Sequence, residues 1–367
     1  MNTQKPSQNC HPERQSLMKT LFEVKQADTT FYQDKLGEFV PEKIIDIHAH
    51  LWLRKFRTGL SSNRAVGWPL RVAADNSIED LLETYRLLFA GKHVTPLMFS
   101  FLDLDDDFEM ANEYVRHCAQ QHNLPCLIFA SPRWSAQQFE DRILAGGFLG
   151  AKVYFTLSEP YIPRAEIRIF DFLPHHQLDV LDKHGWIVML HIPRDGRLKD
   201  PVNLAQMLEI EHRYPNVKVI IAHAGRAYCP EDVGGAFDVL SQTKNMVFDT
   251  AANTNAQVFE QLIRAVGPRR VMFGSDLPFT RMRMRRICEN GTYINLVPKG
   301  HYGDVSDDKH MREVEAKESE KLSFFLYEEI EAFRIAAGCA ELTRSDIADV
   351  FYHNASRLIA SVNNQIG

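Results

Sequence analysis

Short apolar runs alternate with amphipathic stretches along most of this chain. The runs show no internal alternation of apolar and polar residues, which is typical of parallel strands covered on both faces. They predict strands at residues 43–48, 93–101, 126–130, 150–155, 186–191, 217–223, 246–249 and 271–274. The stretches between them carry apolar residues at helical spacing, and predict helices from Ser77 and near residues 108–122, 135–145, 171–184, 202–214 and 255–266.

Eight strands with helices between them indicate an α/β protein, specifically a (β/α)8 TIM barrel. An open doubly wound sheet is the alternative, but the chain lacks a GxGxxG or P-loop motif, and the glycines of residues 146–150 fit a turn into a strand. Such a barrel uses about 250 residues, and this chain has 367. We therefore expect an N-terminal helical arm over residues 1–42, a barrel domain over residues 43–360, and long loops after strands one and eight.

The arm and the two long loops carry further expectations. Residues 1–10 are expected to be disordered, and residues 12–36 to form helical turns that pack on the domain or on a neighbouring subunit, so a homo-oligomer is one expectation. Residues 51–77 are rich in aromatic and arginine side chains and are expected to overlie the site. In the second loop, a run of arginines either binds a substrate carboxylate or, as is more usual, faces solvent or another subunit; its members are Arg281, Arg283, Arg285 and Arg286.

Charge and cysteine content narrow the classes of function. A net charge of −6 and a pI near 6.2 give no basis for non-specific nucleic-acid binding, so the expected partner is a small molecule. The polar N-terminus lacks a signal-peptide core, and no apolar run is long enough to span a bilayer. The six cysteines are scattered without a CxxC pair. This pattern predicts free thiols in a cytoplasmic protein that has no membrane partner.

Side chains that can bind a metal stand at the ends of four predicted strands. His48 and His50 close the first strand, His191 closes the fifth, His223 closes the sixth, and Asp276 follows the eighth. In a barrel the active site lies at the carboxyl ends of the strands. A single histidine at a strand end is usually a core or capping residue. Four repetitions favour a catalytic metal site instead, because imidazole and carboxylate are ligands that catalytic zinc uses.

The ordered set of motifs resembles the amidohydrolase superfamily, specifically the amidohydrolase-related metal-dependent hydrolases that also include aminocarboxymuconate-semialdehyde-type decarboxylases. The residues that carry the resemblance are Asp46-Ile-His48-Ala-His50, Gly150-Ala-Lys152, His191, His223-Ala-Gly-Arg226, Gly274-Ser-Asp276 and Asn354-Ala-Ser-Arg357-Leu. The resemblance implies that a single divalent metal, most often zinc, is bound by His48, His50, His191 and Asp276. It also implies that His223 is a catalytic residue beside the metal.

The chemistry of these residue types supports such roles. A divalent metal lowers the pKa of bound water to about 7. Asp276 can accept the proton of that water and return it to the leaving group, while His223 orients the water or stabilises the oxyanion. Asp46 points to the same side but deeper, so we expect it to make supporting hydrogen bonds.

Lys152 has two interpretations. In the first, which we favour, it forms hydrogen bonds in the barrel mouth or binds substrate. In the second, the resemblance extends to superfamily members in which a carbamylated lysine bridges two metals, and His223 then becomes a ligand of the second metal.

Three alternative functions are consistent with these predicted site residues. The first is a metal-dependent hydrolase that activates a metal-bound water to cleave an amide, ester or lactone bond of a small anionic substrate. The second is a non-hydrolytic decarboxylase of an unsaturated or aromatic acid, which uses the same site and holds carboxylates with Arg54, Arg194 or Arg226. The third is a binding or structural protein that retains the barrel without turnover.

Overall fold

The structure is a computed structural model that describes residues 21–58 and 69–366, and the predicted disorder of residues 1–10 falls outside that part. Eight parallel strands follow one another in the order of the sequence. They are β1 (Lys43–His50), β2 (His93–Phe99), β3 (Ile128–Phe129), β4 (Gly150–Val153), β5 (Ile187–Leu190), β6 (Lys218–Ile221), β7 (Val247–Asp249) and β8 (Val271–Met272). Each predicted strand is present, within a few residues of its expected ends.

Two hydrogen-bonded groups of strands, β1–β2 and β3–β8, meet at two seams. At one seam Met98 of β2 donates its N–H to Pro125 O and accepts from Leu127 N–H. At the other seam Ile47 N–H donates to Phe273 O, and Asp276 N–H donates to His48 O at 2.8 Å. These backbone hydrogen bonds link the ends of the sheet and confirm the predicted (β/α)8 barrel.

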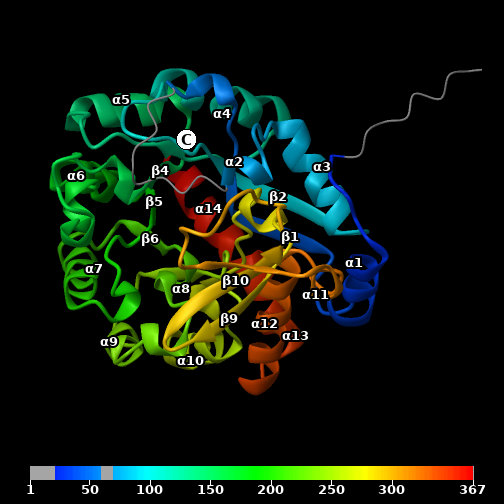
Figure 1. The fold of residues 1–367 in the computed structure, drawn as a ribbon. Coiled ribbons are helices and arrows are strands. Elements are labelled where there is room, and N and C mark those ends of the chain that lie inside the picture. Colours follow the sequence, from blue (N-terminus) through cyan, green and yellow to red (C-terminus); the bar gives the residue numbers. More distant parts are fainter. Residues whose placement is uncertain (1–20, 59–68, 367) are drawn as a thin grey trace, which may run out of the picture.

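Helices form the outer layer around the strands (Figure 1). They are α3 (Ile78–Leu88), α4 (Phe108–His122), α5 (Ala136–Gly146), α6 (His175–His184), α7 (Pro201–Arg213), α9 (Ala236–Leu240), α10 (Ala256–Val266) and α12 (Phe325–Cys339). The short turn α8 (His223–Arg226) directly follows β6 and is largely buried, so it is not part of this layer. Ser77 caps α3 as its sequence predicts, because its hydroxyl accepts from Asp80 N–H while the Asp80 carboxylate accepts from Ser77 N–H. Nearly all of the apolar side chains of the strands are fully buried.

The segment after β8 contains a sheet, whereas the sequence predicts only a long loop there. Strands β9 (Arg285–Glu289), β10 (Thr292–Pro298) and β11 (Met311–Val314) form it, with β9 antiparallel and β11 parallel to β10. One face packs apolar side chains together, namely Ile287, Ile294, Leu296, Val314 and Leu322. The alternation in residues 285–289 and 292–298 is short, and the arginines within it favoured the interpretation as a charged loop.

The N-terminal arm packs on the closing helices of its own chain. It forms α1 (Gln26–Phe31) and η1 (Tyr32–Leu36), and the ring of Tyr327 in α12 lies against Phe31 and Tyr32. Asp28 of α1 is fully buried and pairs with Arg283 from the segment after β8. The chain ends in α13 (Arg344–Ala348), η10 (Asp349–His353) and α14 (Asn354–Ile366). A homo-oligomer stays a prediction.

The expectation of free cysteines is wrong for one pair. Cys229 and Cys288 form a disulfide across 59 residues of sequence, whereas Cys118, Cys126 and Cys339 are free and Cys10 lies outside the described residues. Spacing alone carried no sign of the pair, because the sheet after β8 brings the two residues together. The cytoplasmic location rested in part on free thiols and stays a prediction. In the described part of the chain, no helix combines the length and apolar character needed to cross a membrane.

Candidate metal centre

The two histidines of β1 point to the same side of the strand, as period-two alternation requires. Asp276 meets them from the turn after β8. Its Oδ1 lies 3.4 Å from His48 Nε2 and 3.1 Å from His50 Nε2. All three side chains are buried or nearly so. Three of the four predicted ligands therefore converge at the carboxyl ends of the first and last strands.

The outward nitrogens of three histidines are held by acceptors. Nδ1 of His48 lies 2.8 Å from Asp249 Oδ2, Nδ1 of His50 lies 3.3 Å from Ser100 O, and Nδ1 of His223 lies 2.9 Å from Ala251 O. Each acceptor favours the tautomer that carries its proton on Nδ1, which leaves the Nε2 lone pair free. Burial lowers the pKa of all three imidazoles, that of His223 to about 4, so they are neutral at pH 7.

His191 lies beyond His223, with ring centroids 5.0 Å apart, and burial lowers its pKa well below the usual value. Its Nδ1 is buried without a hydrogen-bond partner. A buried polar atom without a hydrogen-bond partner costs free energy, so this nitrogen is suited to bind a metal ion. The ligand atoms of His48, His223 and Asp276 all lie within 4.8 Å of one another. Neutral imidazoles, a carboxylate and an orphaned nitrogen fit a divalent metal.

Two residues of the centre have backbones in the left-handed region, where φ is 58° at both His223 and Asp276. Such conformations cost about 1–3 kcal/mol in non-glycine residues and persist where the surroundings impose them. At His223 the N–H donates to Asp249 Oδ1 at 2.6 Å, and at Asp276 the N–H donates to His48 O. Asp276 is therefore held in place through the backbone of the strand that carries the histidines.

Gly274 allows β8 to approach β1 at this point. A Cβ atom on Gly274 would lie 2.8 Å from the Cβ of His48 and 3.3 Å from that of Asp249. Real Cβ atoms do not come so close, so the absence of a side chain here sets the position of Asp276 two residues later.

Asp46 and Asp249 support the centre from below. The Asp46 carboxylate accepts from Tyr85 Oη at 2.6 Å, from His48 N–H at 3.0 Å and from Ser275 N–H at 2.8 Å, which confirms its predicted hydrogen-bonding role. Asp249 is not among the residues predicted from the sequence, although β7 also ends in a carboxylate. The place of Asp249 at a strand end is the feature of the sequence that could have identified it, because strands five, six and eight also end in predicted site residues.

Lys152 of β4 is buried and points into the centre. Its Nζ lies 3.3 Å from His48 Nε2 and 4.9 Å from the centroid of the Phe99 ring. Burial lowers the pKa of the Lys152 ammonium to about 8, while the charges of Asp249 and Asp276 oppose that shift. Lys152 therefore stands within reach of His48, one of the predicted metal ligands.

The three arginines predicted to hold substrate carboxylates occupy different surroundings. Arg54 is exposed, and its backbone N–H donates to Asp75. Arg194 forms an ion pair with Asp200 at 3.1 Å, which neutralises its charge. Among the described residues Arg226 forms no ion pair, and its Nη1 donates to three backbone carbonyls. Burial lowers the pKa of His191, and the charge of Arg226 lowers it further. Of the three, Arg226 is the one whose charge acts on a predicted ligand.

The four arginines of the run after β8 also have different partners. Arg281 donates to Val72 O, Arg283 pairs with Asp28, and Arg285 faces Glu328 at 3.5 Å. Burial raises the pKa of Asp276 to about 6, and the charges of Lys152 and Arg286 oppose this shift. Arg286 is therefore the member of the run that acts on the centre.

Aromatic side chains surround the outer side of His50. Trp52, from the loop after β1, has its ring centroid 6.2 Å from that of His50, and Phe279 lies 5.2 Å away. Residues 59–68 of the loop expected to overlie the site are outside the described residues.

A family model described as Amidohydrolase matches residues 45–360 of the chain. The search of curated proteins finds no match. Solved structures share the fold at low identity, and the match extends over nearly the whole of their own chains.

One is a probable 2-pyrone-4,6-dicarboxylic acid hydrolase from Acinetobacter baumannii, solved with citric acid, at 14% identity and a TM-score of 0.53 over 86% of this chain and 99% of that one. Another is a 2,6-dihydroxybenzoate decarboxylase in complex with 2,6-dihydroxybenzoate, at 15% identity and a TM-score of 0.52 over 88% of this chain and 99% of that one. A third is a dihydroxybenzoic acid decarboxylase from a Polaromonas species with bound manganese, at 14% identity and a TM-score of 0.52 over 87% of this chain and 97% of that one.

Proposed function

The chain belongs to the amidohydrolase family, and from this premise we propose that it hydrolyses an amide, ester or lactone bond of a small anionic substrate with one divalent metal, zinc, at this centre. The observation that carries the proposal is the approach of His48 Nε2 and His50 Nε2 to Asp276 Oδ1, at 3.4 Å and 3.1 Å. Each imidazole is oriented from outside by an acceptor on Nδ1. His191 would complete the ligand set with its unpartnered nitrogen.

When bound, the metal supplies Lewis-acid polarisation of the substrate carbonyl and a more acidic water. Asp276 accepts the proton of the attacking water and returns it to the leaving group. Its raised pKa, to about 6, suits a carboxylate that exchanges protons near neutral pH. His223 is neutral and fixed by the Ala251 carbonyl, so that its other nitrogen can orient the water or donate to the oxyanion once protonated.

Substrate binding is assigned to Lys152 and Arg226. Lys152 projects into the centre, and Arg226, which has no ion-pair partner among the described residues, has a charge that lowers the pKa of His191. Arg194 and Arg54 contribute less in this proposal, because the first is neutralised by Asp200 and the second is exposed. If Lys152 is carbamylated instead, the centre takes two metals and His223 becomes a ligand.

A decarboxylase that uses the same residues is the second candidate. The unneutralised charge of Arg226 favours it, because the site can then hold the carboxylate of an acid substrate. The structural neighbours include both decarboxylases of dihydroxybenzoates and a probable pyrone dicarboxylate hydrolase. The two reactions differ in their products: hydrolysis adds the mass of one water, and decarboxylation releases carbon dioxide without consuming water.

Elemental mass spectrometry tests the metal centre. Protein purified without chelator is expected to carry about one zinc per chain, and His191→Ala is expected to lose most of it. His176→Ala is the matched control, because His176 is exposed on α6. Two metals per chain would assign Lys152 the bridging role, and a wild type that stays metal-free after reconstitution would contradict the proposal.

Metal-loaded enzyme is then screened on lactones, esters, amides and aromatic acids, with the product mass and released carbon dioxide recorded.

A further inference from the structure

One face of the sheet β9–β11 carries polar and aromatic side chains. On β9, Arg286 and Cys288 are two residues apart and therefore share this face, while Ile287 points to the other side. Across the antiparallel pair, Arg286 stands opposite Asn295 and Cys288 stands opposite Tyr293. The face is thus defined by these four side chains, and its apolar opposite side is covered by the cluster around Ile287.

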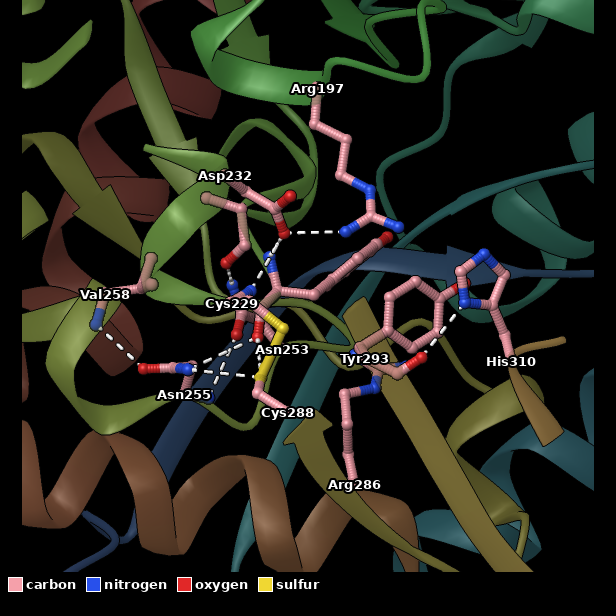
Figure 2. Close-up of a disulfide and its surroundings, with 12 residues drawn as sticks. Arg197, Cys229, Asp232, Asn253, Asn255, Val258, Arg286, Cys288, Tyr293 and His310 are labelled. Atoms are coloured by element: carbon pink, nitrogen blue, oxygen red, sulfur yellow. Dashed lines mark hydrogen bonds and ion pairs between the residues drawn. A yellow bond between two sulfur atoms is a disulfide. The ribbon is translucent and has the colours of Figure 1, made fainter. Parts of the chain in front are cut away.

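The disulfide fixes this face to the barrel. Cys288 bonds to Cys229, which follows Tyr228 in the loop after His223 (Figure 2). The Tyr228 ring centroid lies 6.5 Å from that of His223. The covalent link therefore holds the polar face of β9 next to the loop that carries a residue of the metal centre.

Arg286 reaches from this face to the backbone beside a histidine of the centre. Its Nε donates to Asn295 Oδ1 at 2.9 Å, and its Nη1 donates to Ala252 O at 2.6 Å. Ala252 follows Ala251, whose carbonyl accepts from His223 Nδ1. The guanidinium carbon lies 4.6 Å from the ring centroids of Tyr228, Tyr293 and Phe325.

These partners leave the Arg286 charge without a counterion. Asn295, a backbone carbonyl and the aromatic rings are all neutral, and within residues 21–58 and 69–366 no carboxylate lies at ion-pair distance from Arg286. Its neighbour Arg197, which stacks on the same two tyrosines, is paired with Asp232 at 2.7 Å. Figure 2 shows that pair next to the disulfide. Burying a cation without a counterion costs free energy, and an anion that binds to Arg286 offsets this cost.

We propose that Arg286 binds a carboxylate of the substrate and thereby selects for carboxylate-bearing substrates; this inference rests on the proposed function of the centre. A guanidinium offers a planar fork of donors that matches a carboxylate, and the Nη2 group of Arg286 makes no hydrogen bond with the described residues. The Cys229–Cys288 link acts as the positioning element, because it holds the strand that carries Arg286.

The test is a calorimetric titration of zinc-loaded protein with three carboxylates, namely 2,6-dihydroxybenzoate, 2-pyrone-4,6-dicarboxylate and citrate, and with resorcinol as the ring that lacks a carboxylate. We expect at least one carboxylate to bind the wild type more tightly than resorcinol does. Arg286→Gln should weaken that binding about ten- to a hundredfold. Arg286→Lys should recover part of the loss, since it keeps the charge without the fork.

The matched control is Arg285→Gln, which removes the same charge from the preceding residue of β9, where the side chain is half exposed and faces Glu328. It should leave binding unchanged. Cys288→Ser tests the positioning role and should weaken carboxylate binding at unchanged zinc content. Arg286→Gln that binds as the wild type does, or a wild type that binds none of the three carboxylates, overturns the inference. Zinc content separates the two proposals, because full zinc with binding insensitive to Arg286 contradicts this inference alone, whereas a wild type without zinc contradicts the proposed function.

Discussion

Asp249, at the end of β7, lies with its Oδ2 2.8 Å from Nδ1 of His48, on β1. Its other oxygen accepts from the backbone N–H of His223. One carboxylate thus orients a predicted metal ligand and holds the predicted catalytic histidine.

Asp249→Asn is expected to weaken zinc binding about 10–100-fold, because an outer partner of a ligating histidine fixes its tautomer and raises its basicity. The affinity is measured by competition with a chromophoric chelator. Asp179→Asn is the control, since Asp179 is exposed on α6. Equal zinc affinity in Asp249→Asn and wild type would remove Asp249 from this role.

Gly274→Ala is expected to destabilise the fold by roughly 1–3 kcal/mol, because the new methyl group meets the Cβ of His48 in a packed core. Zinc occupancy should fall with it, since the clash displaces a ligand. Urea unfolding and metal analysis measure both effects. Gly338→Ala provides the contrast: nothing lies within 4 Å of the added atom, and alanine in a helix gains about 1 kcal/mol over glycine. If both variants gained stability, the close approach at Gly274 would not matter.

Arg283→Met is expected to cost about 3–5 kcal/mol of unfolding free energy, because it leaves the fully buried Asp28 carboxylate without its partner. This pair joins the N-terminal arm to the segment after β8. Arg312→Met, which removes an exposed pair with Glu289, should cost less than about 1 kcal/mol. Chemical denaturation compares the two variants. A similar small loss in both would show that the arm contributes little to stability.

Glu329 of α12 links pH to stability. It is fully buried, accepts from Ala252 N–H at 2.8 Å, and burial raises its pKa well above the ordinary value of 4.5. An acid whose pKa is raised in the folded state stabilises the fold fully below its unfolded pKa, and this contribution is lost as pH rises toward the folded pKa.

Glu329→Gln should therefore become more stable relative to the wild type as pH increases above 4.5, because the amide oxygen can still accept from Ala252 N–H while the side chain carries no charge. Unfolding free energies across that range, with exposed Glu320→Gln as the reference, measure the effect. A constant difference between Glu329→Gln and the wild type at every pH would contradict it.

Local patterns along the chain determined the barrel and the places of its candidate ligands. Strand and helix periodicity depends on neighbouring residues, so eight strands, the Ser77 cap and the histidines at the strand ends were predictable. The barrel rule then assigned His48, His50, His191, His223 and Asp276 to one end. Their roles as ligands and catalyst stay predictions.

Tertiary contacts decided what lies around those residues, because they depend on which distant segments meet. The link from Asp249 to His48, the disulfide between Cys229 and Cys288, and the sheet after β8 join residues far apart in sequence. The arginines make the same point: all carry the same charge in the sequence, but a counterion neutralises Arg194 and none stands beside Arg286 among the described residues. Whether a charge is available to a substrate depends on its partners, and the fold alone supplies those.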